Sequence, residues 1–102
     1  MTSIRFEWDE AKNLTNQRKH GVSFEDACEA FRDPLIVTLK ERVEDGEQRW
    51  QTFGKVNGLL LLMIAHTILE HKQNESLVEV IRIISARIAT RRERRNYEDE
   101  IG

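Results

Sequence analysis

The pattern of apolar and polar residues changes about a third of the way along the chain. Phe24, Ala27, Cys28 and Phe31 follow the i, i+3, i+4, i+7 spacing of one helix face. From Leu35 onward, β-branched and other apolar residues run together or alternate with polar ones, which is typical of strands. The sequence therefore predicts helices in its first third and mainly strands after it.

Capping residues mark the ends of the two predicted helices. Asp9 is suited to cap a helix over residues 10–20, and Gly21 supplies the left-handed residue that commonly ends a helix. Ser23 is suited to cap a second helix, which Asp33-Pro34 closes. The first third is therefore predicted to be a helical hairpin.

Turn sequences divide the rest of the chain. Glu44-Asp45-Gly46 is a sequence typical of a turn, and Asn57-Gly58 is the strongest two-residue hairpin signal. Thr90 and Glu93 form a capping box that begins a short C-terminal helix. Strands are expected over residues 35–39, 47–56, 59–69 and 77–85, with a polar loop over residues 70–76.

The predicted order of elements is β-α-α-β-β-β-β-α, counting a short aromatic strand at Phe6-Glu7-Trp8. This order implies an α+β fold in which the N-terminal helical hairpin packs on a mostly antiparallel four- to five-stranded sheet, followed by the C-terminal helix. A chain of 102 residues is expected to form a single domain over residues 1–102. One face of the sheet is left for function.

Composition argues against several classes of protein. The longest apolar run, residues 59–65, is too short to cross a bilayer, and no secretory leader opens the chain, so we expect a cytoplasmic protein with no membrane partner. The formal net charge of -2 argues against nonspecific coating of nucleic acid. His20, His66, His71 and Cys28 lack the spacing of metal ligands, so neither a metal nor a cofactor is expected. His66, inside an apolar strand, has the pattern of a core histidine.

Positive charge is concentrated near the end of the chain. Between Arg82 and Tyr97, six arginines face one carboxylate, Glu93. They are Arg82, Arg87, Arg91, Arg92, Arg94 and Arg95. Guanidinium groups match phosphate in geometry and charge, so this stretch predicts a local anion-binding site.

These arginines differ in their expected roles. Arg82 lies within an apolar strand, on the same alternating face as Val80 and Ile84, so its charge needs either a carboxylate partner or an open cleft. Arg87 lies past the strand end, where residues reach the rim of a site, and Ser85 shares its side. Neighbouring helix positions differ by about 100 degrees, so the arginines of the last helix cannot all face one ligand.

Acid-base and electrostatic chemistry is the kind of catalysis that these residues allow. Lys19 and His20 end the first helix, where the negative helix terminus stabilises cations. His20 is also suited to proton transfer. Glu47 and Arg49 share a strand face. They either form an ion pair with each other, or Glu47 acts as a base while Arg49 binds the phosphate. Tyr97 either stacks on a nucleobase or packs in the core.

A set of residues in a fixed order spans nearly the whole chain. They are Phe6-Glu7-Trp8-Asp9, Lys12-Asn13, Asn16, Lys19-His20-Gly21-Val22, Phe24-Glu25, Ala27, Phe31, Asp33-Pro34, Gly46-Glu47, Arg49, Arg82 to Arg87, Ala89 and Arg92 to Tyr97. With this order and spacing, the chain resembles the BrnT family of type II toxin-antitoxin toxins. The resemblance implies a RelE-like fold and an endoribonuclease that arrests translation.

The resemblance also implies partners. A BrnA-type antitoxin with a ribbon-helix-helix DNA-binding part is expected, in a heterotetramer of two toxins and two antitoxins that represses its own operon. Contact with operator DNA comes mainly through the antitoxin, and RNA is the substrate.

Metal-independent RNA cleavage needs a base, an acid and cations for the developing charge. The candidates for catalysis are Lys19, His20, Glu47, Arg49, Arg82 and Arg87, and those for substrate binding are Ser85, Arg91, Arg94 and Tyr97. Two alternatives remain beside this interpretation. The chain could be a non-catalytic interaction module whose Arg cluster docks an acidic partner segment, or a nucleic-acid binder that does not cut.

Overall fold

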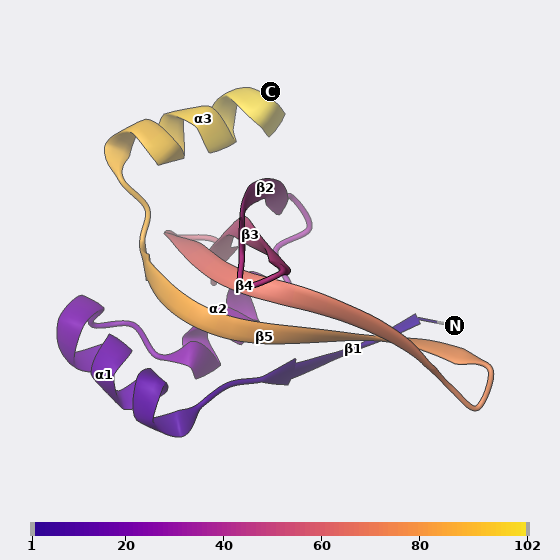
Figure 1. Ribbon diagram of the computed structural model, residues 1–102. Helices are drawn as coiled ribbons and strands as arrows, with labels where there is room; N and C mark the ends of the chain where they lie inside the picture. The colour runs from indigo at the N-terminus through magenta and orange to yellow at the C-terminus, as the bar shows by residue number, and fades with distance from the viewer. Residues whose placement is uncertain (1, 102) are drawn as a thin grey trace.

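The computed structural model describes residues 2–101 and shows three helices with one five-stranded sheet (Figure 1). In chain order the elements are β1 (Thr2–Glu7), α1 (Glu10–His20), α2 (Phe24–Ala30), β2 (Val37–Glu44), β3 (Glu47–Val56), β4 (Leu60–Gln73), β5 (Ser76–Ile88) and α3 (Arg91–Ile101). The strand order across the sheet is β1-β5-β4-β3-β2. The predicted α+β class is therefore confirmed.

The sheet is mostly antiparallel, as predicted, but one parallel pair at its edge makes it mixed. The neighbours from β2 to β5 pair antiparallel, but β1 pairs parallel to β5, with Ile4 opposite Glu79. Most of the chain separates β1 from β5, so no hairpin turn forces the two strands to run in opposite directions.

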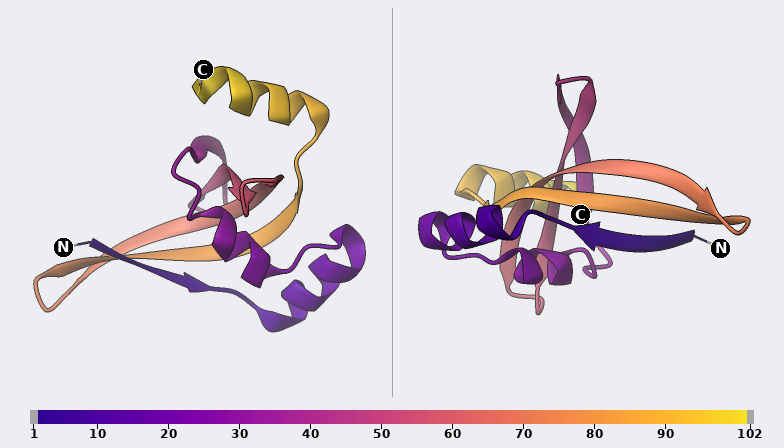
Figure 2. Two further views of the ribbon diagram at one scale, coloured as in Figure 1. Left: turned by 180° about the vertical axis from the view of Figure 1, so that it is seen from behind. Right: turned by 60° about the horizontal axis from the view of Figure 1, so that its bottom comes forward.

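The helices cover opposite faces of the sheet. α1 and α2 lie on one face and α3 stands on the other, as Figures 1 and 2 show. Under α1 and α2, the main core contains Val22, Phe24, Ala27, Ala30, Leu62, Ile64, Ile81, Ile83 and Ala86. Under α3, a smaller cluster contains Phe53, Leu61, Met63 and Tyr97. We call the second face the α3-side face.

The two N-terminal helices do not form the predicted hairpin. α1 packs on β5, whereas α2 packs on β3, β4 and β5. The buried residues of α1 are Asn13 and Asn16, so this helix has no apolar stripe to share with α2. The Asn16 side-chain amide instead donates to the carbonyl oxygens of Val22 at 2.9 Å and Ala86 at 2.8 Å. Buried amides therefore fix α1 against the sheet.

The predicted caps are confirmed. The Asp9 side chain accepts hydrogen bonds from the first turn of α1, and Gly21 has a φ of 71° at its end. Ser23 caps α2 by accepting from the amide of Asp26. At the start of α3, Thr90 and Glu93 accept from each other's backbone amides at 3.1 and 2.9 Å.

One hairpin was predicted correctly and another was missed. Asn57 and Gly58 have φ values of 53° and 68°, as the turn between β3 and β4 requires. The expected loop over residues 70–76 is wrong, because β4 runs to Gln73, β5 begins at Ser76, and Asn74 and Glu75 form the turn with positive φ. The polar residues lie on an exposed arm, visible at one end of the molecule in Figure 2, where strand pairing needs no buried side chains. None of the described helices is both long and apolar enough to cross a membrane.

Candidate functional site

A β-bulge in β5 decides which side chains reach the α3-side face. Ala65 of β4 pairs with Ser85, but the next residue, His66, pairs with Ile83, so Ile84 is the extra residue on β5. Arg82 and Val80 pair with Thr67 and Leu69, so they share a face as predicted, whereas Ile84 is the inserted residue and has no partner on β4.

The bulge brings Arg82, Ser85 and Arg87 to one face. They pair with Thr67, Ala65 and Met63, which alternate along β4 and share its α3-side face. Without the extra residue, Arg82 would lie on the opposite face from Ser85 and Arg87. The register therefore assembles three predicted site residues from a single strand.

Residues from α1, β3, β4 and β5 enclose a small hollow of about 70 Å³ beside this face. It is lined by Asp9, Lys12, Glu47, Arg49, Thr67, Arg82, Ile83 and Ile84. Three of the predicted site residues, Glu47, Arg49 and Arg82, thus lie together although they come from distant parts of the sequence. Three cations and two carboxylates surround the hollow.

The two arginines of the hollow are not neutralised by close ion pairs. The nearest carboxylate oxygen to Arg49 is that of Glu44, at 3.9 Å, and the Arg49 Nε is buried without a hydrogen-bond partner among the described residues. Arg82 is exposed and forms no ion pair with any carboxylate that the structure describes. Both guanidinium groups therefore have donors available for an anion.

A second depression of about 310 Å³ adjoins the first, and the two share Lys12 and Ile84. Its lining includes Lys19 and His20 from the end of α1 and Ser85 from β5. Lys19 is exposed and His20 is half-buried. The helix end and the bulged strand therefore place an amine, an imidazole and a hydroxyl beside the Arg49 and Arg82 hollow.

Arg87 is engaged with Glu93 instead of lying free. Its two terminal nitrogens donate to the two Glu93 carboxylate oxygens at 2.8 and 2.9 Å, a bidentate pair. The hydrogen bond from Arg87 lowers the pKa of Glu93, and the same pair raises the pKa of Arg87. Because Glu93 also caps α3, Arg87 anchors the start of that helix.

Tyr97 anchors α3 further along. Its side chain is 2% exposed, and its hydroxyl donates to the Asp33 carboxylate at 2.7 Å. Burial and this hydrogen bond raise the pKa of Tyr97 to about 12. Burial opposes ionisation of Asp33, but hydrogen bonds from Tyr97 and from the Lys55 and Leu35 amides hold the pKa of Asp33 below its usual value. The ring is therefore packed where an RNA base cannot stack on it.

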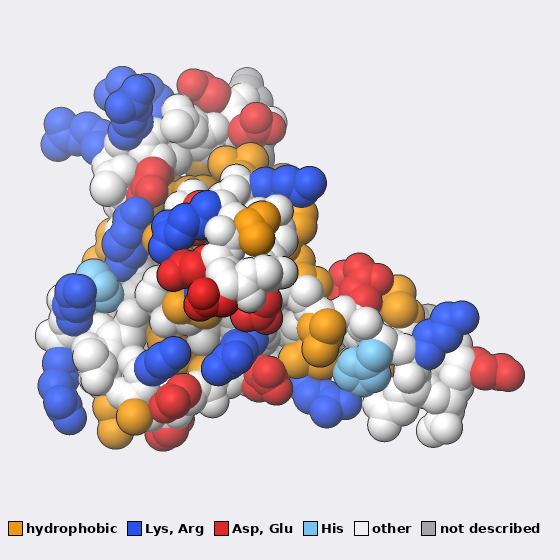
Figure 3. Space-filling model, viewed as in Figure 1, with side chains coloured by type: hydrophobic (Ala, Val, Ile, Leu, Met, Phe, Trp, Pro, Cys, Tyr) orange, Lys and Arg blue, Asp and Glu red, His pale blue; other side chains and the backbone are white. Residues whose placement is uncertain are grey.

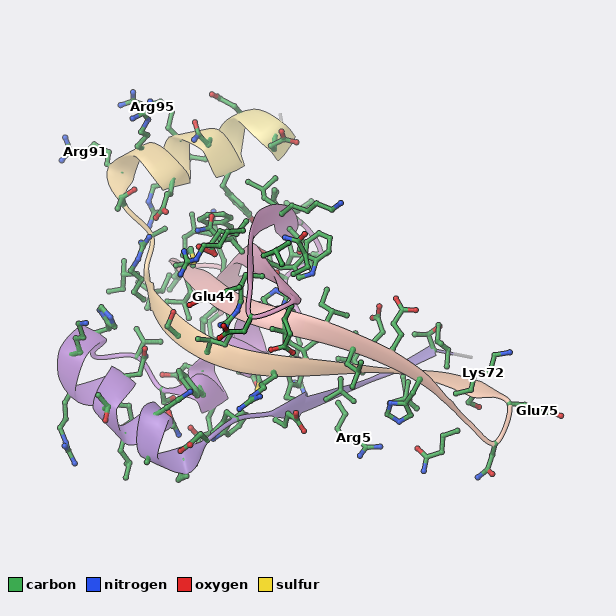
Figure 4. All side chains as sticks on the ribbon, in the orientation of Figure 1. Arg5, Glu44, Lys72, Glu75, Arg91 and Arg95 are labelled. Atoms are coloured by element: carbon green, nitrogen blue, oxygen red, sulfur yellow. The ribbon has the colours of Figure 1, made fainter. Side chains whose placement is uncertain are left out.

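The arginines of α3 lie apart from the hollow. The side chains of Arg91 and Arg95 point away from the sheet (Figure 4). Arg94, one turn before Tyr97, is half-buried. In Figure 3, Lys and Arg side chains gather over the start of α3 and over α1 along one side of the molecule.

The remaining histidine and cysteine candidates are structural. His66 is buried, forms a 2.7 Å hydrogen bond with the Thr52 hydroxyl and packs edge-on against Phe31, which confirms the expected core histidine. Burial lowers the pKa of His66. Burial raises the pKa of the Cys28 thiol to about 11. Among the described residues, no three His, Cys, Asp or Glu side chains lie close enough together to hold a metal ion.

Asp9 and Lys12 line the hollow, although the sequence argument did not select them as site residues. The helix cap explains Asp9 without a second role. Lys12 and Lys19 are seven residues apart, so they lie on one face of α1. That spacing is the signal that could have identified Lys12.

Comparisons with known proteins identify the family and the fold of the chain. Residues 8–93 match the family model described as "Ribonuclease toxin, BrnT, of type II toxin-antitoxin system". The crystal structure of the Brucella abortus ribonuclease toxin BrnT shares the fold, with a TM-score of 0.52 and 24% identity, over 89% of this chain and 100% of that one. No curated protein matches the sequence.

The family match covers the helix that carries Lys12, Lys19 and His20, and the whole sheet apart from β1. It ends at Glu93, within the first turn of α3, so it includes every residue that lines the hollow. The chain therefore belongs to the BrnT family of ribonuclease toxins of type II toxin-antitoxin systems.

Proposed function

We propose that this toxin is a metal-independent endoribonuclease that cuts RNA around the Arg49 and Arg82 hollow and so arrests translation in the cytoplasm. The observation that carries the proposal is that Arg49 and Arg82 of the sheet and Lys12 of α1 line one hollow together with Glu47. Arg82 has no ion pair among the described residues and Arg49 has only the 3.9 Å contact with Glu44, so both guanidinium groups can bind a phosphate of the RNA backbone.

The proposed reaction uses the ribose as its nucleophile. A base removes the proton of the 2′-hydroxyl, the 2′-oxygen attacks the adjacent phosphorus, and the bond from phosphorus to the 5′-oxygen breaks. An acid then protonates that leaving oxygen, so that a 2′,3′-cyclic phosphate and a 5′-hydroxyl are formed. Two groups that exchange protons and a cationic clamp are sufficient for this reaction.

The residues of the two adjoining depressions can fill these roles. We assign Arg49 and Arg82 to the charge that develops on the phosphate oxygens, with Lys12 beside them. Glu47 on one side and His20 on the other are the candidates for base and acid, and Lys19 adds positive charge next to His20. Ser85 lines the same depression as Lys19 and His20, so we assign it to substrate contact, and Arg94 is a more distant candidate.

Three of the earlier candidates take no part in the proposed chemistry. Arg87 and Tyr97 hold α3 through Glu93 and Asp33, and their polar groups are already bonded. Arg91 points away from the face that carries the hollow. The arginine-rich stretch therefore contributes mainly Arg82 to the proposed chemistry.

Family membership implies an antitoxin partner. We propose a BrnA-type antitoxin with a ribbon-helix-helix part, in a complex of two toxins and two antitoxins that contacts operator DNA mainly through the antitoxin. Its role is to neutralise the ribonuclease.

The test is cleavage of end-labelled RNA by the purified chain in EDTA, on free RNA and on translating ribosomes. The Arg49→Ala/Arg82→Ala variant, shown to be folded by circular dichroism, serves as the comparison. Cleavage by the native chain in either arm, with 2′,3′-cyclic phosphate ends and loss in the variant, supports the proposal. If neither arm shows cleavage, the ribonuclease assignment is wrong, and RNA binding without cleavage would then support the nucleic-acid binder.

A further inference from the structure

A groove of about 450 Å³ separates α3 from strands β2 and β3. It is lined by Val37, Leu39, Gln51, Phe53, Glu93, Asn96, Tyr97, Asp99 and Glu100. We call it the α3 groove. It lies apart from the Arg49 and Arg82 hollow, and the two share no lining residue.

The α3 groove has an apolar floor that is left partly open. Val37 and Leu39 alternate along β2, and Leu39 is 48% exposed. β2 is an edge strand, so its outer hydrogen-bonding groups have no strand partner in the described sheet. Across the groove, Tyr97 is the one buried residue of α3 among those whose side chains are described. Exposed apolar side chains beside an unpaired strand edge form a surface suited to another chain.

The charge of the groove specifies the chemistry of that chain. Asp99 and Glu100 carry the negative charge of its helical wall, because Glu93 is already paired with Arg87, and no Lys or Arg belongs to the described lining. Asp99 and Glu100 also lie in the last turns of α3, where the helix terminus adds negative potential. RNA is repelled by such a wall, whereas a segment with Lys or Arg beside apolar anchors is complementary to it.

We infer that the antitoxin docks in the α3 groove through a segment that combines apolar side chains with Lys or Arg. The inference rests on the antitoxin partner of the proposed function and names the surface that it uses. It also opposes the alternative in which the Arg cluster docks an acidic segment, because the outward-pointing Arg91 and Arg95 lie away from this groove.

The position of the groove explains how docking would restrain the toxin. Gln51 lines the groove and pairs with Ala65, which pairs on its other side with Ser85 of the candidate site. The groove therefore opens onto the same α3-side face as the Arg49 and Arg82 hollow. A segment seated in it places protein beside the path of an RNA strand along that face.

The test measures the affinity of the purified toxin for the purified protein encoded in the reading frame next to its own gene, by calorimetry. Leu39→Lys changes the floor, and Asp99→Lys/Glu100→Lys reverses the wall charge at a helix end that tolerates cations. Val43→Lys is the matched control for the first, because Val43 is 64% exposed on β2 and does not line the groove. Arg91→Glu/Arg95→Glu is the control for the second.

We expect Leu39→Lys to weaken binding by roughly 30-fold or more and the wall variant by about 10-fold, as for contacts near an interface centre. The two controls should stay within about 3-fold, as for surface changes outside an interface. The inference is overturned if Arg91→Glu/Arg95→Glu abolishes binding while the groove variants bind normally. It is also overturned if Leu39→Lys leaves antitoxin binding intact but turns a toxin dimer into a monomer, since the occupant would then be a second copy.

RNA cleavage by the same variants separates this inference from the proposed ribonuclease. Groove variants should cut RNA like the native chain and resist inhibition by the antitoxin. If the native chain does not cut RNA, the proposed function fails, but the affinities still decide where the antitoxin docks.

Discussion

The two faces of the sheet differ in what covers them. The face under α1 and α2 is packed with the apolar side chains of the main core, and Phe24, Leu62 and Ile64 are fully buried there. The α3-side face has only a small apolar cluster around Tyr97. Beyond that cluster it continues into polar side chains, among them Arg49, Thr67 and Arg82.

This difference separates stability from function within one sheet. Burial of apolar area is the main contribution to folding, so the first face should determine the free energy of unfolding. Exposed charges contribute little to stability, so the open end of the second face can hold cations for a ligand. Changes on the first face should therefore lower the free energy of unfolding most, whereas changes at the open, polar end of the second face should alter activity alone.

The largest loss of stability is expected from Phe24→Ala. Phe24 has no exposed surface, and its ring packs edge-on against Trp8. Removing a buried aromatic side chain typically lowers the free energy of unfolding by about 3–5 kcal/mol. Urea denaturation measures the change, and Leu14→Ala, at a position that is 47% exposed, is the control with an expected loss under about 1 kcal/mol.

Gly54→Ala tests how closely α2 approaches the sheet. An added methyl group at Gly54 would overlap the backbone carbonyl of Ala30, the last residue of α2. Neither backbone can move far within this packed layer, so we expect a loss of about 1–3 kcal/mol. A thermal midpoint equal to that of the native chain would show that α2 does not pack as described. Gly46, with open space around it, is not a suitable control, because its φ is 80°.

Tyr97→Phe breaks the attachment of α3 without changing the shape of the ring. The Asp33 carboxylate loses the hydroxyl donor but keeps the amides of Lys55 and Leu35. We expect a loss of about 1–2 kcal/mol, as for a hydrogen bond to a charged group. Amide hydrogen exchange should become faster in α3 alone. An equal acceleration of exchange over the whole chain would contradict this localised anchoring.

Acidification should destabilise the protein through His66. Burial lowers its pKa below the ordinary value of 6.5, so the unfolded chain takes up a proton more readily than the folded one. The stabilising effect is therefore complete above pH 6.5 and is lost as the pH falls, with a slope of up to about 1.4 kcal/mol per pH unit. Unfolding free energies at pH 7.5 and 5.5 measure this slope.

The control for this pH dependence is the exposed His71. The slope should flatten in His66→Gln and persist in His71→Gln. An unchanged slope in His66→Gln would assign the pH dependence to other groups.

Local signals in the sequence predicted much of the fold. The caps at Asp9, Ser23 and Thr90 and the Asn57-Gly58 turn depend on neighbouring residues alone, and all of them are confirmed. The paired strands over residues 70–76 were missed, because their polar side chains resemble those of a loop. The parallel pairing of β1 was missed because it joins opposite ends of the chain.

The site was predicted in its parts but not in its arrangement. Glu47, Arg49 and Arg82 were selected by charge and strand position, and the structure places them around one hollow. The bulge at Ile84, which sets the face of Arg82, depends on pairing with β4 and has no signal in β5 itself. The hydrogen bond from Arg87 to Glu93 was not predicted, because the capping box alone already explained the presence of Glu93.

The central claim is that RNA chemistry occurs at the open end of the α3-side face. The most direct test is the single-turnover cleavage rate of Arg49→Gln/Arg82→Gln compared with Arg91→Gln/Arg95→Gln, with the thermal midpoint of each variant measured. Loss of a charge-stabilising donor typically costs about 100- to 1,000-fold in rate, so the first variant should lose at least that much while remaining folded. The second, which removes the same charge from the outer side of α3, should stay within about 3-fold of the native rate, as expected for groups remote from the reacting atoms. Equal losses in the two variants, or a larger loss in the second, would contradict the claim.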